Sequence, residues 1–284
     1  MIKNLIVSAF ADEYSPNFDT QLDMLSKNGV GYIEPRFIGE KNISDITCHE
    51  AKEIAKKLSY YGIGVSSIGS PLGKIKLSDD FSAHMEKAAR VFETANTLGA
   101  KNIRMFSFYS RQGATRAEFR EEAIEKLGAM LDLADRHGVR LCHENEGRIY
   151  GESPEDCFDL LSHFGGRLRQ VYDMGNFLLC GHDPYNESFK KLLPHIEYFH
   201  IKDAISAGAI VPPGKGKAYI KEILTDFAAQ SKAPFFATLE PHLETFSGLN
   251  KLTNSTFNNP YKFESPEAAF LTALADFKKI VEEV

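Results

Sequence analysis

The sequence predicts a single closed (β/α)8 barrel of the α/β class, and three observations lead to this prediction. Short apolar or β-branched runs alternate with longer segments of helical periodicity, and eight such units follow one another along the 284 residues. The ends of successive runs are spaced by roughly 26 to 40 residues, the length of a strand and its returning helix. No change of composition and no Ser/Gly linker divides the chain, so we expect one domain over residues 1–284.

The predicted strands are the apolar runs themselves, taken in chain order. They are expected at residues 5–8, 32–37, 64–68, 102–107, 140–144, 170–173, 198–202 and 235–240. The alternative is a doubly wound open sheet, which would bind its ligand at a topological switch point. No G-x-G-x-x-G motif follows the first run, so the closed barrel is favoured.

Capping residues mark the helices between these strands. Ser15-Pro16, Ser153-Pro154 and Ser265-Pro266 each place an N-cap residue before a proline, the pattern that begins a helix. Glycines that can adopt a left-handed conformation are expected to end four helices, at positions 29, 62, 99 and 138.

Composition and charge narrow the classes of function. The formal net charge of −6 leaves no basic surface for a nucleic acid, and no apolar stretch approaches the roughly 20 residues that span a membrane. The apolar run over residues 5–11 fits a buried first strand better than a signal peptide. The four cysteines show no C-x-x-C spacing, so we expect a reduced, cytoplasmic protein.

In a barrel of this kind the functional residues lie at the C-terminal ends of the strands. The last four predicted strands each end on a potential metal ligand, namely Glu144, Asp173, His200 and Glu240. Three carboxylates and one imidazole would suit a divalent ion such as Mn²⁺, Mg²⁺, Co²⁺ or Zn²⁺. The alternation of a strand points Glu146, Lys202 and His242 into the same mouth, as candidates for contact with a substrate.

Each of these residues also has a simpler interpretation. A single carboxylate at a strand end is most often a helix cap or a solvated side chain, but four converging on one mouth would repel one another without a cation. Glu34 is either a substrate contact or the ion-pair partner of Arg36, and His182 either reaches the mouth or belongs to a turn. Glu146 and His242 are also compatible with plain solvation, and His143 is expected to face the helices.

Several short motifs at these positions carry a resemblance to a known family. In chain order they are Glu144-Asn145, Asp173-Met174-Gly175-Asn176, His200-Ile201-Lys202-Asp203, Pro213-Gly214-Lys215-Gly216 and Leu239-Glu240. Their order and spacing resemble those of the xylose-isomerase-like TIM barrel superfamily, which contains sugar isomerases and epimerases, inosose dehydratases and endonuclease IV enzymes. The resemblance implies that Glu144, Asp173, His200 and Glu240 bind one metal ion. It further implies that Glu144 and Glu240 move the proton, as the metal-bound glutamates do in ketose epimerases.

The residue types fit proton transfer next to a carbonyl group. Removing that proton creates an enediolate, whose charge a chelated divalent ion stabilises, and a carboxylate on each side of the sugar can take and return the proton. The leading hypothesis is therefore a metal-dependent isomerase or epimerase of a small sugar or related polyhydroxy carbonyl compound, with Lys202 holding a substrate oxygen. A homo-oligomer is compatible with the sequence.

Three other functions stand beside this hypothesis. An inosose-type dehydratase would use the same ion and base. A multi-zinc endonuclease is less favoured because the third, fourth and seventh strand ends lack the additional histidines. The remaining alternative is a sugar-binding protein without catalytic activity.

Two loops complete the predictions. The Gly214-Lys215-Gly216-Lys217 segment is either a phosphate contact or a simple glycine-rich turn, and no arginine follows Lys202-Asp203 to grip a ketohexose. The connection over residues 243–264 is longer than the usual 2 to 6 residues of such loops. It is expected near the active-site mouth, as a lid, an Ω-loop or a subunit contact.

Overall fold

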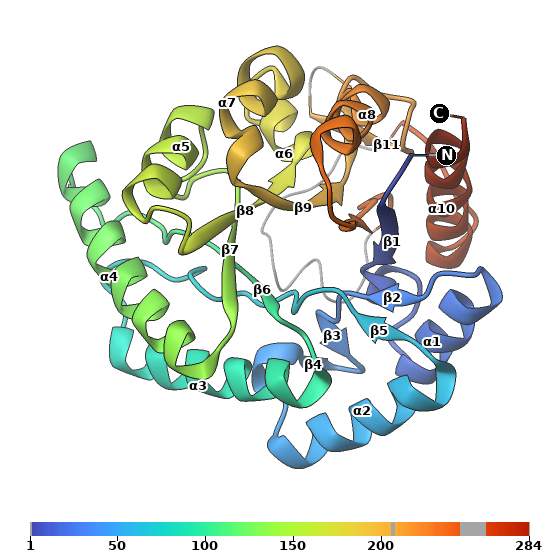
Figure 1. Cartoon of the computed structure of the whole chain (residues 1–284), viewed down its shortest axis with the longest axis horizontal. Helices are drawn as coiled ribbons and strands as arrows, with labels where there is room; N and C mark the ends of the chain where they lie inside the picture. Colours follow the sequence, from blue (N-terminus) through green and yellow to red (C-terminus); the bar gives the residue numbers. More distant parts are fainter. Residues whose placement is uncertain (1, 206–207, 245–259, 284) are drawn as a thin grey trace.

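The computed structural model describes residues 2–205, 208–244 and 260–283, which form a barrel of strands inside a ring of helices (Figure 1). Six parallel strands make up the main sheet, in the order β1-β12-β9-β8-β7-β6. Their bounds are Leu5–Ala9 for β1, Asn102–Met105 for β6, Arg140–Glu144 for β7, Leu168–Asp173 for β8, Ile196–Ile201 for β9 and Phe235–Leu239 for β12. The order is that of a barrel whose last strand returns to the first.

Two short strands, β2 (Tyr32–Ile33) and β5 (Gly64–Val65), close the barrel between β1 and β6. The Glu34 N–H donates to Ala9 O at 3.1 Å, and the Ile68 N–H donates to Asn102 O at 2.9 Å. Backbone hydrogen bonds therefore join each short strand to its longer neighbour, and the predicted closed barrel is confirmed.

These two strands are shorter than the predicted runs over 32–37 and 64–68, for a local reason. Pro35 has no N–H to donate to a ladder, and the serine hydroxyls that follow β5 compete for backbone carbonyls. Ser66 Oγ donates to Ile33 O at 3.2 Å, and Ser67 Oγ donates to Asn102 O at 3.1 Å. The same two carbonyls also accept backbone N–H groups, from Ser66 at 3.0 Å and from Ile68 at 2.9 Å, so the hydroxyls share these acceptors with the ladder at this side of the barrel.

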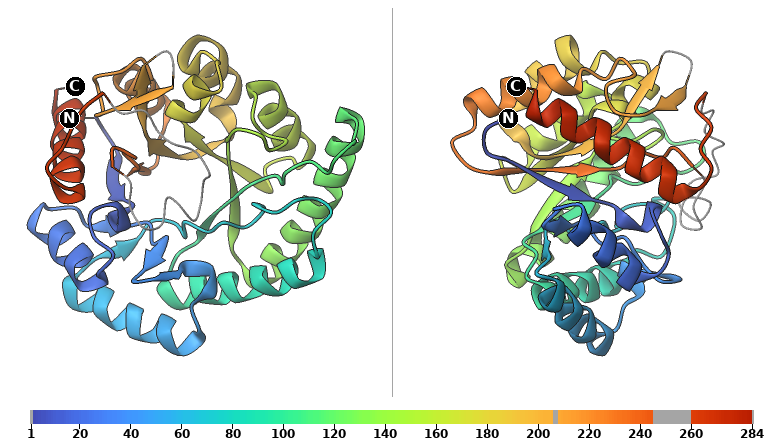
Figure 2. Two further views of the ribbon diagram at one scale, coloured as in Figure 1. Left: turned by 180° about the vertical axis from the view of Figure 1, so that it is seen from behind. Right: turned by 90° about the vertical axis from the view of Figure 1, so that its right-hand side faces the viewer.

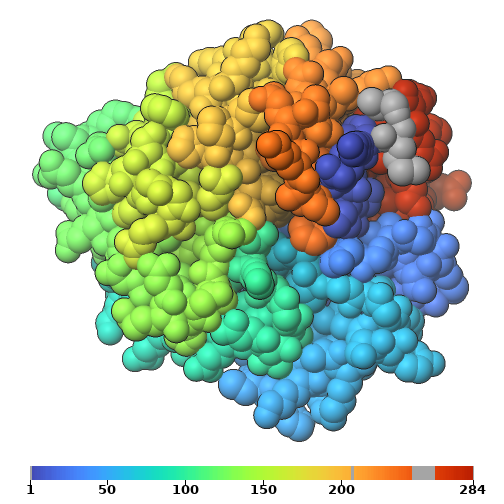
Figure 3. Space-filling model, in the orientation of Figure 1, coloured from blue at the N-terminus to red at the C-terminus, as the bar shows by residue number. Residues whose placement is uncertain are grey.

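Nine described helices follow the strands. They are α1 (Phe18–Lys27), α2 (Cys48–Tyr61), α3 (Phe81–Leu98), α4 (Arg116–His137), α5 (Pro154–His163), α6 (Met174–Leu179), α7 (Lys190–Leu192), α8 (Ile220–Gln230) and α10 (Pro266–Glu282). Figure 2 shows the ring from behind and from the side. In Figure 3 the colours run around the molecule in sequence order, so the blue N-terminal segment meets the orange and red C-terminal part.

Most of the predicted caps are present. Ser153 and Ser265 are the N-caps of α5 and α10, and Gly62, Gly99 and Gly138 end α2, α3 and α4 in the left-handed conformation. At α1, Gly29 follows the helix in the left-handed conformation as predicted, but the N-cap prediction is wrong, because Asn17 and not Ser15 is the N-cap. The Asn17 side chain accepts from the Thr20 N–H at 3.0 Å, while the Ser15 hydroxyl accepts from Asn17 itself.

Two antiparallel hairpins extend the loops above the strand ends. The first, β3 (Phe37–Ile38) with β4 (Lys41–Asn42), follows β2, and the second, β10 (Asp203–Ile205) with β11 (Ala209–Val211), follows β9. The sequence analysis did not predict them, since strands of two or three residues have too little alternation to recognise.

The apolar core lies mainly between the barrel and the helices, and the barrel interior holds only a small cluster. Cys142, Val171 and Tyr198 form that inner cluster, with Phe236 packed against it. Polar side chains such as Ser8 and Ser66 share the interior, with their hydroxyl oxygens 2.7 Å apart. The side chains inside the barrel thus change from a small apolar cluster to charged groups at the mouth.

Three further predictions concern membrane-spanning helices, the state of the cysteines and the loop over residues 243–264. Within the described ranges, no helix combines the length and apolar character that a membrane span requires. All four cysteines carry free thiols. The lid or subunit contact expected over residues 243–264 lies mostly outside the described residues, which omit 245–259.

A buried histidine in α3 leads to a prediction on stability. His84 Nε2 accepts the Gly73 N–H at 3.0 Å, which fixes the loop after β5, and burial lowers the pKa of His84 to about 4. The unfolded chain, with a pKa near 6.5, binds the proton first, so stability should fall as the pH drops from 6.5 toward 4. We expect His84→Gln, which keeps an acceptor but does not titrate, to lessen this fall by about 2 kcal/mol at pH 5.

Calorimetric Tm values of both proteins at pH 7.5 and pH 5 would test this. An equal drop in Tm for the two proteins would contradict the assignment. Because the pKa of buried His143 is also lowered to about 4, the variant should retain part of the acid sensitivity.

Candidate metal centre

Four potential ligands meet at the mouth of the barrel because their strands are parallel and in register. Asp173 at the end of β8 pairs with His200 of β9, and His200 pairs with Thr238 of β12. Glu144 ends β7, and Glu240 follows β12 directly. One ligand atom from each of the four residues lies within 4.8 Å of all the others, and all four side chains are buried. The structure therefore brings the predicted set together.

The two ring nitrogens of His200 face different partners. Its Nδ1 lies 3.1 Å from Glu144 Oε1 and 3.4 Å from Glu240 Oε2, whereas its Nε2 points toward Glu34. Nδ1 is thus the atom that faces the carboxylates and would bind an ion. Three carboxylates and one imidazole nitrogen fit a divalent cation by their chemistry, and their close approach in a buried site needs positive charge between them.

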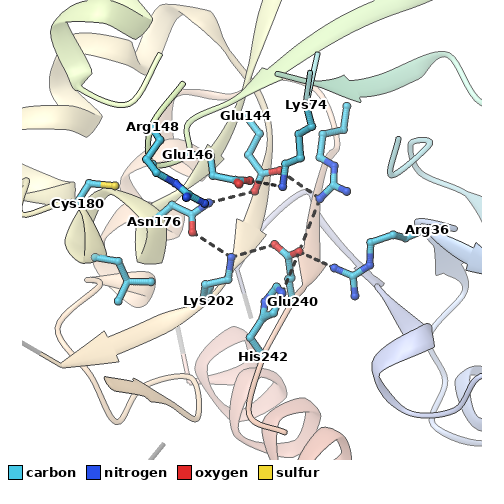
Figure 4. A pocket seen from close by; sticks show the side chains of 13 residues that line it. Arg36, Lys74, Glu144, Glu146, Arg148, Asn176, Cys180, Lys202, Glu240 and His242 are labelled. Carbon is cyan, nitrogen blue, oxygen red and sulfur yellow. Dashed lines mark hydrogen bonds and ion pairs between the residues drawn. The ribbon is translucent and has the colours of Figure 1, made fainter. Parts of the chain in front are cut away.

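In this arrangement, positive side chains balance that charge. Lys202 Nζ lies 2.9 Å from Asp173 Oδ2 and 3.2 Å from Glu240 Oε2. Two arginines extend the network: Arg104 lies 3.2 Å from Glu144, and Arg36 lies 2.8 Å from Glu240 (Figure 4).

The charges shift the pKa values of the cluster in opposite directions. Burial opposes ionisation of Glu144, but His200 and Arg104 prevail and lower its pKa to about 2. Burial raises the pKa of Asp173 to about 6 despite Lys202, and Glu144 and Glu240 add to this rise. Burial would lower the pKa of His200, yet Glu144 and Glu34 hold it well above its usual range. A divalent ion would therefore displace a proton from His200 when it binds.

Glu34 contacts His200 at Nε2, the ring nitrogen that does not face Glu144 and Glu240. Its carboxylate accepts from the Thr238 hydroxyl at 2.8 Å and from the Tyr198 hydroxyl at 3.0 Å, and it lies 3.3 Å from His200 Nε2. Glu34 is fully buried and does not line the pocket. The sequence predicts that Glu34 either contacts a substrate or forms an ion pair with Arg36, and its position fits neither alternative. Glu34 instead orients the imidazole, the role of a carboxylate behind a metal-binding histidine.

We expect Glu34→Gln to weaken divalent-metal binding by about 10- to 100-fold, because the amide would no longer fix the charge and orientation of His200. Titration calorimetry with Mn²⁺ would measure the change. Half-buried Glu197→Gln, near the start of β9 and remote from the mouth, is the matched control and should bind as the wild type does. Unchanged affinity in a folded Glu34→Gln protein would contradict the role of Glu34.

Two asparagines of the motifs named above hold the four residues in place, a role that was not predicted for them from the sequence. Asn145 donates to Asp173 O at 2.9 Å and accepts from the Asp173 N–H at 3.1 Å, so its side chain continues the pairing of β7 with β8. Asn176 donates to Glu144 Oε1 at 3.3 Å and accepts from Lys202 at 3.1 Å. The available signal was spacing, since Asn176 lies three residues after Asp173, the N-cap of α6.

The roles of Arg104 and Arg36 as partners of the two glutamates were also missed. Their guanidinium carbons lie 4.9 and 4.3 Å from the centre of the buried Phe10 ring, which both groups therefore contact. Arg104 could have been recognised as a charged residue inside a buried strand, which is rare unless the charge is paired. Arg36 also contacts Asp12 at 2.9 Å and Glu13 at 3.1 Å, so it joins the loop after β1 to the mouth.

The remaining candidates fall into two groups. Glu146, Lys202 and His242 line a pocket of about 180 Å³ at the mouth of the barrel, and their contact with a substrate stays a prediction. His182 is not among the lining residues, and its Nδ1 lies 4.0 Å from Glu187 Oε1. The turn interpretation of His182 therefore fits its position better than the expected contact with substrate.

The glycine-rich segment after β11 has a structural partner. Asp203 Oδ2 accepts the N–H groups of Gly214 at 2.8 Å and Gly216 at 2.9 Å, and Asp203 Oδ1 accepts from Ala218. A Cβ atom at Gly216 would lie 2.1 Å from Asp203 Oδ1, so this position requires glycine. These N–H groups are occupied, which favours the simple turn over the phosphate contact.

Comparisons with known proteins agree with this geometry. A family model described as xylose isomerase-like TIM barrel matches residues 22–241. A 3-dehydroshikimate dehydratase of Bacillus anthracis is 25% identical over 134 residues, which are 47% of this chain and 48% of that protein. The chain thus spans about half the length of the curated relative in this match.

Three solved structures share the fold at low identity. A probable 3-DHS dehydratase of Bacillus anthracis has a TM-score of 0.74 at 19% identity and covers 98% of this chain and 100% of its own. A D-psicose 3-epimerase of Clostridium cellulolyticum H10 has a TM-score of 0.73 at 13% identity, covering 98% and 99%. A protein of Mycobacterium smegmatis in complex with magnesium has a TM-score of 0.69 at 15% identity, covering 97% and 96%.

Proposed function

This chain belongs to the xylose isomerase-like TIM barrel family, and from this premise we propose that it is a divalent-metal-dependent isomerase or epimerase of a small polyhydroxy carbonyl compound. The observation that carries the proposal is the pair of buried glutamates, Glu144 and Glu240, on either side of His200 at the base of one pocket. Glu144, Asp173, His200 and Glu240 would hold the ion. The magnesium complex of the similar Mycobacterium smegmatis protein supports a hard divalent cation.

The two glutamates are the proposed groups that move the proton. Burial opposes their ionisation, but for Glu144 the charges of His200 and Arg104, and for Glu240 those of Lys202 and His242, keep both pKa values low. A carboxylate of low pKa is a weak base, so the carbon acid must be activated, and a bound divalent ion would supply that activation by polarising the carbonyl group.

Lys202 completes the proposed chemistry. Its ammonium group is buried at the base of the pocket and lies 3.2 Å from Glu240, one of the two proposed bases. When a proton leaves the carbon next to a carbonyl group, negative charge develops on the oxygen, and a fixed cation nearby stabilises it. Glu240 on one side and Glu144 on the other can then return the proton to the opposite face or to the adjacent carbon.

A dehydratase is the second candidate, because the curated relative is a 3-dehydroshikimate dehydratase. Such a lyase would use the same base and ion, and it differs in the group that leaves after the proton is taken. The endonuclease and the non-catalytic sugar-binding protein are less favoured, since the pocket of about 180 Å³ suits a small molecule and holds two candidate bases.

One experiment tests the proposal and separates the two reactions. The purified protein would be analysed for metal and then incubated with ketoses and inososes in deuterated water, with products followed by NMR. Exchange of carbon-bound hydrogen with formation of an isomer supports an isomerase or epimerase, and an unsaturated product that has lost water supports a dehydratase. Metal binding without either reaction would favour the non-catalytic alternative.

A further inference from the structure

More cationic side chains line the pocket than the proposed proton transfer requires. Five cationic side chains line it, namely Arg36, Lys74, Arg104, Arg148 and Lys202, against the three carboxylates of Glu144, Glu146 and Glu240. Arg36, Arg104 and Lys202 each contact a carboxylate of the predicted metal set. The other two cations lie on the wall above these ligands and have no role in the chemistry described so far.

Lys74 and Arg148 differ in whether a carboxylate lies beside the positive charge. Lys74 Nζ lies 2.7 Å from Glu146 Oε2 and 4.2 Å from the centre of the Phe106 ring. Arg148 lies over the Tyr109 ring at 5.9 Å, and in the part of the chain that the structure describes its guanidinium has no carboxylate partner. Figure 4 shows Arg148, Glu146 and Lys74 along one edge of the pocket. One positive charge is therefore left unmatched on this wall.

The backbone holds Arg148 there at a cost. Its φ is 71°, in the left-handed region that a residue with a side chain rarely adopts, and its N–H donates to the Glu152 carboxylate. Such a conformation is energetically unfavourable and persists where the surroundings enforce it, often at binding sites. His242, which also lines the pocket, has a φ of 46°. Two of the five described non-glycine residues with positive φ, Arg148 and His242, thus line the pocket.

We propose that the substrate carries a carboxylate, which binds to the Arg148 guanidinium beside the Lys74 ammonium while the polyhydroxy carbonyl part lies over the metal ligands. This inference rests on the proposed function. A guanidinium forms two parallel hydrogen bonds with a carboxylate. Because Glu146 already balances Lys74, the wall matches a single negative charge better than a phosphate monoester, which carries −1.5 to −2.

The position of the glycine-rich segment also argues against a phosphate. In barrels of this class a phosphate commonly binds in the loops after strands seven and eight, through backbone N–H groups. Here Asp203 occupies the N–H groups of Gly214 and Gly216 in that region. The cationic wall lies instead on the loops that follow β5 and β7, which carry Lys74 and Arg148.

Binding measurements would test this without the need for turnover. Calorimetry on the Mn²⁺-loaded protein would compare D-fructose, D-fructuronate and D-fructose 6-phosphate, which share one ketose end, and quinate with its neutral methyl ester. We expect the carboxylates to bind about 10- to 100-fold more tightly than their neutral counterparts, as a charge-assisted hydrogen-bonded pair should. Arg148→Gln should remove this preference and leave the binding of neutral ligands unchanged.

Exposed Arg136→Gln, at the end of α4, removes the same charge far from the pocket and should keep the preference. Equal binding of charged and neutral ligands by the wild type, or a preference that survives Arg148→Gln, would overturn the proposal. Tighter binding of the phosphate ester, or binding of no ligand in the panel by the loaded protein, would overturn it as well. Selective carboxylate binding without hydrogen exchange would uphold this inference and count against the proposed reaction alone.

Discussion

Asp173→Ala and His200→Ala are expected to lower divalent-metal affinity by on the order of 100-fold or more, with the barrel still folded. Each variant removes one of four ligands, and even the partners behind metal ligands contribute 10- to 100-fold. Both residues lie at the mouth and not between the barrel and its helices, so far-ultraviolet circular dichroism should be unchanged. Metal analysis and Mn²⁺ titration would measure the loss.

The effect of a chelator on the melting temperature tests the same metal site independently. Metal binding stabilises the folded state by RT ln(1 + [L]/Kd), where [L] is the concentration of free ion, so EDTA should lower the Tm of the loaded wild type but not that of Asp173→Asn. Burial raises the pKa of Asp173 above its usual range, which means that its charge destabilises the metal-free fold at neutral pH. Metal-free Asp173→Asn should therefore melt at a higher temperature than metal-free wild type.

Exposed Asp132→Ala, on the outer face of α4, is the control and should respond to EDTA as the wild type does. Full metal occupancy in both Asp173→Ala and His200→Ala would refute the assignment of the metal centre.

Glu240→Gln should slow turnover by about 10²- to 10⁴-fold, the usual effect of removing a general base. The amide keeps an oxygen that can bind the ion but cannot accept the proton, so metal and substrate should still bind. Arg36 would keep its contacts with Asp12 and Glu13, which limits the structural damage. The readout is hydrogen exchange in deuterated water with whichever ketose or inosose the wild type converts.

Glu146→Gln is the matched control for this variant. Glu146 lines the same pocket, but it is paired with Lys74 and is not one of the four predicted ligands. Its effect on turnover should be much smaller than that of Glu240→Gln. Wild-type exchange by Glu240→Gln would place the proton transfer elsewhere, with Glu144 as the next candidate.

Local sequence patterns were enough to predict the barrel and the four residues that meet at its mouth. Parallel strands end at one face, and their alternation selects the side chains that point inward, so strand ends alone bring Glu144, Asp173, His200 and Glu240 together. The N-cap prediction failed at Ser15 because two polar residues, Ser15 and Asn17 on either side of Pro16, could each begin the helix. Only the folded backbone decides between them.

The partners of those residues could not be predicted in the same way. Glu34 lies 166 positions from His200, and Arg36 lies 204 positions from Glu240, and both contacts exist because the barrel closes between its first and last strands. The sequence showed that Glu34 and Arg36 point inward, but alternation does not say how deep a side chain lies or which rotamer it adopts. The tertiary structure decided that Glu34 lies below the histidine and that Arg36 faces Glu240.

The sequence by itself therefore determined the fold class and the four strand-end residues that meet at the mouth, since these depend on periodicity and on residues at strand ends. Only the tertiary structure decided which charges are matched and which are not. It paired Asp203 with the glycine-rich turn and Lys74 with Glu146, and it left Arg148 without a carboxylate among the described residues. Such pairing depends on distances of a few ångströms between loops far apart in the chain, which no local pattern encodes.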